Sequence, residues 1–363
     1  MKKILIVGQT PPPIGGQAVM IAHLVNADFP NYKIYHVRMC FSREMKDMGK
    51  MQIWKIYHLV EIIAKIYYYR ILKGVNILYY PPSGPNSAVY RDMAILFPTR
   101  WLFKDTIFHF HASGLSTHYN KMGKWMNLVF KVCFFKPTAS IHLSESCPKE
   151  GEFLLSKRCY IVPNGLPDIA DKPNKIIYAP PLDILFIGLL EESKGEMDLI
   201  KAIELLKAEG IDIQLNIAGE FKRIEYKNIF HQYIEEHNLT NEIHYIGIIQ
   251  GDEKDRAFRS ASIFCFPSYF HSESFPLVLI EAMEYGLPIV ASKWRGIPDM
   301  IKDRYNGLLC ETKNPESIAD KIRLIYNDSV LREQIAYNAR KTFDEKYSLK
   351  AHLEAMENVF STI

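Results

Sequence analysis

The chain has 363 residues, too many for one ordinary hydrophobic core and enough for two domains, and its 48% hydrophobic and 23% charged residues exclude a disordered chain or a coiled coil. It contains no run of about 18 uncharged apolar residues, which excludes a membrane-spanning helix. The net charge of +3 is uneven: residues 1–175 contain 23 Lys and Arg against 11 Asp and Glu, whereas residues 176–363 contain 21 against 30.

The basic first half favours an anionic partner such as a membrane surface, a phosphorylated lipid or a nucleic acid. A nucleic acid is the weakest of the three candidates, because no known RNA- or DNA-binding motif accompanies the charge. The six cysteines have neither zinc-ligand nor CxxC spacing, and they indicate reduced thiols in a cytoplasmic protein.

Short apolar runs alternate with helical patterns along the first half. The run 3–8 precedes a Pro/Gly turn and a helical stretch over 17–26. Further strands are expected at 33–38, 76–80, 106–111, 139–143 and 160–162, with helices most pronounced over 51–72 and 121–135. This alternation predicts a parallel sheet that is covered on both faces by helices.

A second series of the same kind follows residues 163–181, which contain five prolines and indicate a linker. The expected strands are 183–187, 214–218, 243–246, 263–266, 288–291 and 307–310. The expected helices are 196–209, 227–237, 252–260, 276–285 and 315–327, and the tail 328–363 is helical. We therefore predict an α/β protein of two Rossmann-like, doubly wound domains facing a central cleft. The domains are 1–170 and 171–344, and the terminal helix, about 345–363, packs back on the first.

The first turn contains three prolines and then Gly15 and Gly16, between a strand and a helix. Free backbone N–H groups at a helix start can meet an anion. The turn is not GxGxxG and no P-loop lysine follows it. We favour a loop that a ligand approaches closely over a glycine turn that serves chain reversal alone.

The second domain offers a lysine and a pair of glutamates. Lys194 lies where a helix begins after the strand 183–187, and its ammonium suits a diphosphate; a solvated lysine is the alternative. Glu273 and Glu281 are eight residues apart, with Pro276 suited to the first helical position. The two carboxylates could hold the hydroxyls of a ribose and a sugar, unless both are simply exposed.

Six motifs occur in order along the chain: PPPxGG, FHASG, VPNG, SKG, ESFPLVLIEAMEYGLPIVAS and GIPDMI. Together they resemble family 4 (group 1) retaining glycosyltransferases of the GT-B fold, and the block Ser272–Asp299 is the most specific. The resemblance implies an enzyme that transfers a sugar, of hexose type, from a nucleoside-diphosphate sugar to a glycan or a lipid-linked glycan, in surface polysaccharide biosynthesis. It implies neither a cofactor nor a metal.

The resemblance also assigns roles to residues. Glu281 would hold the ribose, Glu273 the transferred sugar, and Lys194 the diphosphate, together with the backbone of Phe275, Pro276 and Leu277. Gly15 and Gly16 would close on the diphosphate from the other domain. The sequence departs from the family at Leu189, usually an arginine, and at Ser274, often a glycine.

His109 and His111 are two residues apart in the expected strand 106–111, so both side chains point to the same side of it. The family has a histidine at the carboxyl end of this strand, and His111 matches it better. The resemblance therefore implies a catalytic role for His111, at the sheet edge where ligands bind in open α/β sheets.

Helical stretches of the first half mix aromatic and basic residues, over Lys50–Lys73 and Lys121–Lys136. Such helices can lie on an anionic bilayer, so we expect peripheral association with the cytoplasmic face of a membrane. The alternative is that their apolar faces pack on the sheet. Two other functions remain open: a nucleotide-sugar epimerase on the same fold, and an inactive nucleotide-sugar-binding subunit.

Overall fold

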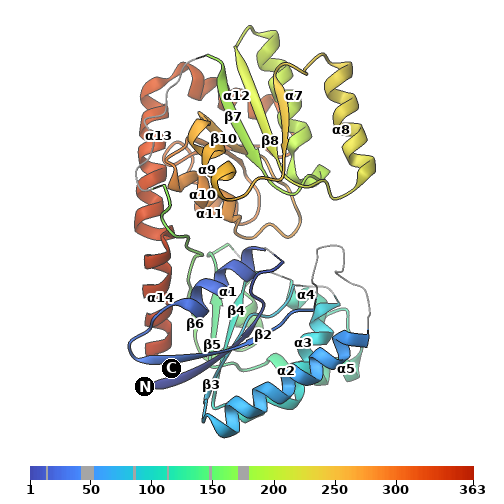
Figure 1. The fold of residues 1–363 in the computed structure, drawn as a ribbon, viewed down its shortest axis with the longest axis vertical. Helices are drawn as coiled ribbons and strands as arrows, with labels where there is room; N and C mark the ends of the chain where they lie inside the picture. The colour runs from blue at the N-terminus through green and yellow to red at the C-terminus, as the bar shows by residue number, and fades with distance from the viewer. Residues whose placement is uncertain (14, 42–52, 85–86, 113, 147–148, 171–179) are drawn as a thin grey trace. The chain divides into compact units, whose positions relative to one another are not determined.

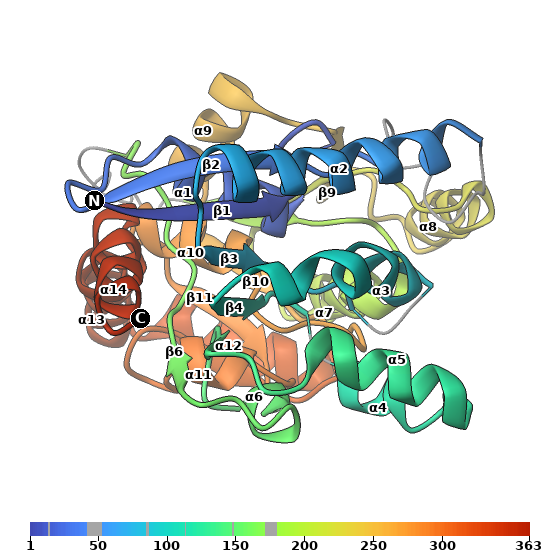
Figure 2. The same ribbon diagram turned by 90° about the horizontal axis from the view of Figure 1, so that it is seen from below.

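The computed structural model describes residues 1–13, 15–41, 53–84, 87–112, 114–146, 149–170 and 180–363. The chain forms two units, Met1–Gly165 with His352–Ile363, and Leu166–Ala351. Each unit contains a six-stranded parallel sheet with helices on both faces (Figures 1 and 2). The prediction of two doubly wound, Rossmann-like domains is therefore confirmed.

The first unit has the strand order β2-β1-β3-β4-β5-β6. Its strands are β1 (Lys2–Gly8), β2 (Tyr32–Arg38), β3 (Ile77–Tyr80), β4 (Asp105–Phe110), β5 (Ala139–His142) and β6 (Cys159–Ile161). Its helices are α1 (Gly16–Asn26), α2 (Ile53–Leu72), α3 (Ala88–Thr99), α4 (Leu115–Tyr119), α5 (Lys124–Phe134), α6 (Glu150–Phe153) and most of α14 (Leu349–Ser361).

Alternating residues of each strand enter two different cores. In β1, Ile4 and Ile6 pack with residues of α1 and α14, whereas Leu5 and Val7 pack with residues of α2, α3 and α5. Figure 2 shows α2, α3 and α5 in succession along one side of this sheet. The terminal helix α14 contributes Phe360, whose ring lies 5.5 Å from that of Phe29.

The second unit has the strand order β12-β11-β10-β7-β8-β9. Its strands are β7 (Leu182–Ile187), β8 (Ile213–Ala218), β9 (Ile243–Gly247), β10 (Ile263–Phe266), β11 (Ile289–Ser292) and β12 (Leu308–Cys310). Its helices are α7 (Glu196–Ala208), α8 (Ile224–Glu236), α9 (Gly251–Ser260), α10 (Leu277–Glu284), α11 (Ile297–Met300), α12 (Pro315–Asn327) and α13 (Ser329–Thr342).

The expected linker 163–181 lies partly outside the described residues. Within the described part, the backbone N–H groups of Ile169 and Ala170 donate to Oε1 of Glu284, at 2.6 and 2.8 Å. Leu166 donates its N–H to the carbonyl of Tyr347 at 2.9 Å. Residues 166–170 are thus fixed to the second unit, and the boundaries between the units fall after Gly165 and Ala351.

Candidate functional site

The order of the second sheet brings two loops together. Strand β7 lies between β10 and β8, so the chain leaves β7 and β10 toward opposite sides of the sheet. This is the topological switch point, where ligands bind in open α/β sheets. The loop after β7 carries Lys194 and the loop after β10 carries Glu273.

A glycine lets these two loops approach closely. Gly195 has φ +79°, and a Cβ atom there would lie 2.3 Å from the carbonyl oxygen of Pro267. A residue with a side chain would have to push the loops apart. A short 3₁₀ turn over Glu192–Lys194 precedes this glycine, and α7 starts immediately after it.

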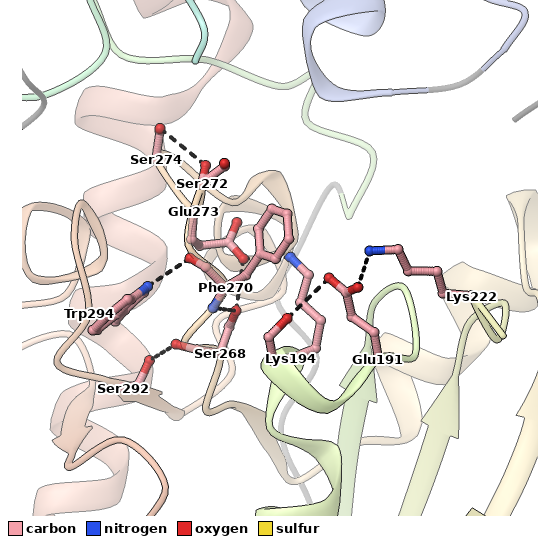
Figure 3. Close-up of polar contacts among 11 residues, drawn as sticks. Glu191, Lys194, Lys222, Ser268, Phe270, Ser272, Glu273, Ser274, Ser292 and Trp294 are labelled. Atoms are coloured by element: carbon pink, nitrogen blue, oxygen red, sulfur yellow. Dashed lines mark hydrogen bonds and ion pairs between the residues drawn. The ribbon is translucent and has the colours of Figure 1, made fainter. Parts of the chain in front are cut away.

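Lys194 and Glu273 form an ion pair at this point (Figure 3). The Lys194 Nζ donates to Oε2 of Glu273 at 2.6 Å, and the two side chains are 13% and 10% exposed. The ammonium also lies 4.5 Å from the ring centroid of Phe270, a cation–π contact. Lys194 is therefore not a solvated lysine, and Glu273 is not a simply exposed glutamate.

The loop that carries Glu273 is held by several hydrogen bonds (Figure 3). Ser268 Oγ donates to Oε2 of Glu273 at 2.9 Å, and the hydroxyl of Ser292 donates to the carbonyl of Ser268. The indole N–H of Trp294 donates to the carbonyl of Phe270 at 2.7 Å. The carboxylate is thereby oriented before any ligand arrives.

The expected donor-binding segment Ser274–Leu277 leads into α10. Pro276 caps the helix and Leu277 is its first residue, so Pro276 lies one position earlier than predicted. Ser274 is buried and its hydroxyl donates to the carbonyl of Ser272 at 3.3 Å, rather than capping the helix. Phe275 is buried against Tyr347, with ring centroids 5.7 Å apart.

Glu281 lies on α10 and is also paired. Its Oε1 accepts from Lys254 Nζ, on α9, at 2.5 Å, and the two side chains are partly buried. A carboxylate can accept more than one hydrogen bond, so Glu281 keeps acceptor capacity for a ligand hydroxyl while it is paired with Lys254. The sequence analysis missed Lys254, because it is 27 residues away from Glu281 on a helix of ordinary charged composition.

The loop after β8 adds a second ion pair beside the first. Lys222 donates to Oε2 of Glu191, a buried carboxylate three residues before Lys194. The sequence analysis missed this pair as well. The signal that could have found it is the position of Lys222, just past the carboxyl end of β8, the strand next to β7. Leu189, in the same loop as Glu191, is partly buried.

Gly15 and Gly16 lie at the start of α1 in the first unit. Gly15 has extended backbone, φ −162° and ψ 153°, and a Cβ atom there would have no heavy atom within 4 Å. Neither chain reversal nor packing within this unit therefore requires glycine at position 15. The preceding proline turn is held by Arg38, which donates to the carbonyl of Pro12 at 2.8 Å.

His111 follows directly after β4, which ends at Phe110, so it lies just beyond the strand rather than within it. The centroid of its ring lies 4.2 Å from that of His109, with the two ring planes tilted by 33°. Both ring nitrogens of His111 are shielded from solvent without a hydrogen-bond partner among the described residues. Burial lowers the pKa of His111 to about 3, so the imidazole is neutral at pH 7. His109 is buried on β4, where its Nδ1 lies 2.5 Å from the Tyr79 hydroxyl.

A buried glutamate fixes the loop after His111. Glu150 accepts the backbone N–H groups of Gly114, Leu115 and Ser116, at 2.7, 3.0 and 2.9 Å. These contacts cap the first turn of α4 with a carboxylate from α6. Among the described residues, no group of three or more His, Cys, Asp or Glu side chains is placed to hold a metal ion.

Residues 168–342, which contain Lys194, Glu273 and Glu281, match the protein family of glycosyl transferases group 1. Over this segment, just under half of its length, the chain is similar to the group 1 glycosyltransferases. It is 33% identical to an uncharacterized glycosyltransferase of Methanocaldococcus jannaschii over 49% of this chain and 44% of that protein. It is 27% identical to the capsular polysaccharide biosynthesis glycosyltransferase CapM of Staphylococcus aureus, over 49% of this chain and 45% of that protein.

The chain thus spans about half the length of these curated relatives. Among solved structures, the crystal structure of HepE of Anabaena in complex with UDP has a TM-score of 0.70 at 16% identity, with 100% of both chains covered. At this identity the likeness shows the fold, and it extends over both units of the chain. The predicted GT-B architecture of two Rossmann-like domains is confirmed.

Proposed function

We propose that this protein is a glycosyltransferase that moves a sugar from a nucleoside-diphosphate sugar to a glycan or a lipid-linked glycan, with retention at the anomeric carbon and without a metal ion, in surface polysaccharide biosynthesis. The observation that carries the proposal is the ion pair of Lys194 and Glu273 at the switch point of the group 1 domain. CapM acts in capsular polysaccharide biosynthesis and HepE binds UDP, which supports this choice of acceptor and donor.

The contacts suggest how the second domain would hold the donor. The Lys194 ammonium would contact the diphosphate, where negative charge grows as the bond to the sugar's C1 breaks. Glu273, already aligned by Ser268, would accept hydrogen bonds from the sugar. Glu281, oriented by Lys254, would accept them from the ribose.

The first domain would contribute Gly15, Gly16 and His111. The open space in front of Gly15 allows a phosphate to come close to the backbone N–H groups at the start of α1. Both ring nitrogens of His111 are shielded from solvent, so a sugar would reach them only after the groups that cover them move. The neutral imidazole would then donate to one hydroxyl and accept from another, which suits positioning of a sugar better than transfer of a charge.

Incubation with UDP-, GDP- and ADP-sugars, with and without EDTA, tests the proposal. Transfer to an acceptor, or slow hydrolysis of one donor, unchanged by EDTA, is the expected result. An isomerised donor would identify an epimerase, and tight binding without turnover would identify an inactive subunit. Loss of activity in EDTA that added Mg²⁺ or Mn²⁺ restores would refute metal independence alone.

We also propose that the protein associates peripherally with an anionic membrane surface at the cytoplasmic face, through α2 and α5. Of the twenty residues of α2, Ile62 and Ile66 are buried, whereas many large apolar side chains of α2, α3 and α5 are exposed. These are Ile53, Ile56, Tyr57, Val60, Tyr68, Ile71, Leu72, Tyr90, Phe97, Trp125, Met126, Leu128 and Val132. Packing in the core therefore leaves many apolar side chains of these helices exposed, most of all on α2.

The charges of the same helices support a lipid surface as the partner. Helix α5 carries Lys124 and Lys131 and no acidic residue, and α2 carries three cations and one glutamate. Exposed Trp and Tyr beside Lys are typical of helices that lie in the membrane interface. Lys50, the start of the expected segment, lies outside the described residues. Among the described helices, none is long and apolar enough to cross a bilayer.

A further inference from the structure

The loop after β8, residues 219–223, is joined to the loop that carries Lys194. The N–H of Leu190 donates to the carbonyl of Glu220 at 2.8 Å, and the N–H of Lys222 donates to the carbonyl of Leu190 at 3.1 Å. Gly219 makes this approach possible, because it has φ +148° and a Cβ atom there would lie 1.8 Å from the carbonyl oxygen of Gly188. The backbone of Lys222 is thus fixed beside the turn before Lys194.

Glu191 connects the two lysines (Figure 3). Its carboxylate accepts from the Lys222 ammonium and, at 3.1 Å, from the Ser193 hydroxyl. Its carbonyl accepts the N–H of Lys194 at 2.8 Å, so Glu191 and Lys194 are the two ends of one turn. Figure 3 shows Glu191 between Lys222 and the Lys194–Glu273 pair.

The charged residues in and around this turn leave an excess of negative charge. The charge of Lys194 is offset by Glu273, and the turn itself carries Glu191 and Glu192, while Leu189 is uncharged. A diphosphate bears negative charge on both phosphates, so Lys194 with its partner offers it little net attraction. A second ammonium that is itself paired with a carboxylate leaves the net charge negative, but it adds charge-assisted hydrogen-bond donors for the diphosphate.

Lys222 has the required exposure. Its side chain is 50% exposed, whereas that of Glu191 is 10% exposed. An ammonium has three donors, so the contact with Glu191 holds the head group in place and leaves donors that face solvent. An anion arriving from the solvent side can share this cation without breaking its contact with the protein.

We propose that Lys222 contacts the diphosphate of the donor and acts with Lys194 as the second cation of the binding site. The inference rests on the proposed function, because it takes a nucleoside-diphosphate sugar as the ligand. It assigns to Glu191 the task of positioning Lys222. The second cation of the site then comes from the loop after β8 rather than from position 189.

Calorimetric titration with UDP, GDP and ADP, and then with the matching nucleoside, tests the proposal. We expect Lys222→Met to raise the Kd for the bound diphosphate about tenfold, as for a lost charge-assisted hydrogen bond, and to leave binding of the nucleoside unchanged. Lys222→Arg should bind the diphosphate within about threefold of wild type, since it keeps the charge.

Two controls separate a ligand contact from a structural role. The first control, Lys207→Met, breaks the Lys207–Glu242 ion pair at the far end of α7, where the lysine side chain is 39% exposed. This variant should bind the diphosphate like wild type. The second control is the double variant Glu191→Gln with Lys222→Met, which leaves no unpaired carboxylate. It should still bind the diphosphate about tenfold more weakly than the single variant Glu191→Gln.

The outcomes distinguish the two proposals. Wild-type protein that binds a diphosphate, with a Lys222→Met variant of equal affinity, overturns the role of Lys222 and leaves the proposed function standing. Equal weakening of diphosphate and nucleoside binding overturns it too, since it indicates a structural role. Wild-type protein that binds none of the three diphosphates overturns both.

Discussion

At the scale of single residues, the 2.6 Å contact between Lys194 and Glu273 couples the two charges of the site. Removing one of them leaves the other partly buried without its partner, which costs stability as well as function. We predict that Lys194→Ala lowers turnover by about a hundredfold or more, because it removes a contact to the leaving group, and also lowers the melting temperature.

The double variant Lys194→Met with Glu273→Gln separates the two effects. It removes both charges, so the melting temperature should return toward the wild-type value while turnover stays low. Thermal unfolding and steady-state kinetics on the same preparations measure both quantities. Turnover of Lys194→Ala within a few-fold of wild type would exclude Lys194 from the reaction.

Sequence reasoning selected Glu273 and Glu281 together from their eight-residue spacing, and Lys194 separately from its place at a helix start. It could not pair Lys194 with Glu273, because the two residues are 79 positions apart and their contact depends on how two loops pack at Gly195. Lys222 escaped notice for the same reason: its neighbour Glu191 is brought near by loop-to-loop hydrogen bonds.

At the scale of elements, the apolar runs located the strands well, because a parallel strand buried on both faces is a short continuous apolar segment. The sequence analysis did not predict helix α3. This helix contains Pro98 and three buried apolar residues in its last turns, so its sequence has only a weak helical pattern. The helix expected over 121–135 begins at Lys124, after Gly123. The strand expected to include His111 ends at Phe110, since pairing with β5 stops there.

The junction of β4 and α14 makes the stability of the first unit depend on pH. Burial lowers the pKa of His111 to about 3 and that of His352, on α14, to about 4. The unfolded chain binds protons at these histidines below about pH 6.5, whereas the folded chain does not, so stability is lost as the pH falls from there toward 4. Each histidine should contribute up to about 1.4 kcal/mol per pH unit to this slope.

Urea unfolding at pH 7, 6 and 5 measures the slope. His352→Gln can still donate to the carbonyl of Pro163, which lies 2.6 Å from His352 Nδ1, and should reduce the slope by up to about 1.4 kcal/mol per pH unit. Met356→Leu, a buried change on the same helix, should shift stability at every pH and keep the wild-type slope. If the unfolding free energy of His352→Gln kept the wild-type slope against pH, His352 would be protonated to the same extent in the folded and unfolded states.

At the scale of the whole molecule, the uneven charge of the sequence has a structural counterpart. The basic half forms most of the first unit, and α5 carries Lys124, Lys131 and Trp125, the last of which is 84% exposed. The acidic half forms the domain that would bind the donor. An enzyme that extends a lipid-linked glycan would gain from holding its basic unit at the bilayer, where the acceptor is concentrated.

The membrane proposal predicts that lipid binding depends on position as well as on charge. Each Lys near an anionic surface contributes about 1 kcal/mol, so Lys55→Glu, Lys124→Glu and Lys131→Glu together should weaken binding to anionic vesicles by more than about a hundredfold. Lys201→Glu, Lys302→Glu and Lys346→Glu make the same change of net charge in the second unit and should bind like wild type. Sedimentation with phosphatidylserine-containing and neutral vesicles, at low and high salt, measures the partition.

The apolar side chains should act in a way that salt does not screen. Ile56→Ser with Trp125→Ser removes two exposed apolar groups without changing the charge, and should weaken the binding that remains at high salt, where attraction between exposed charges is screened beyond about a Debye length. If high salt abolished the binding of wild-type protein to vesicles, these helices would bind the membrane through their charges alone. Equal partition of the wild type and the Lys55, Lys124 and Lys131 variant at low salt would exclude α2 and α5 as the membrane-binding surface and favour a soluble acceptor.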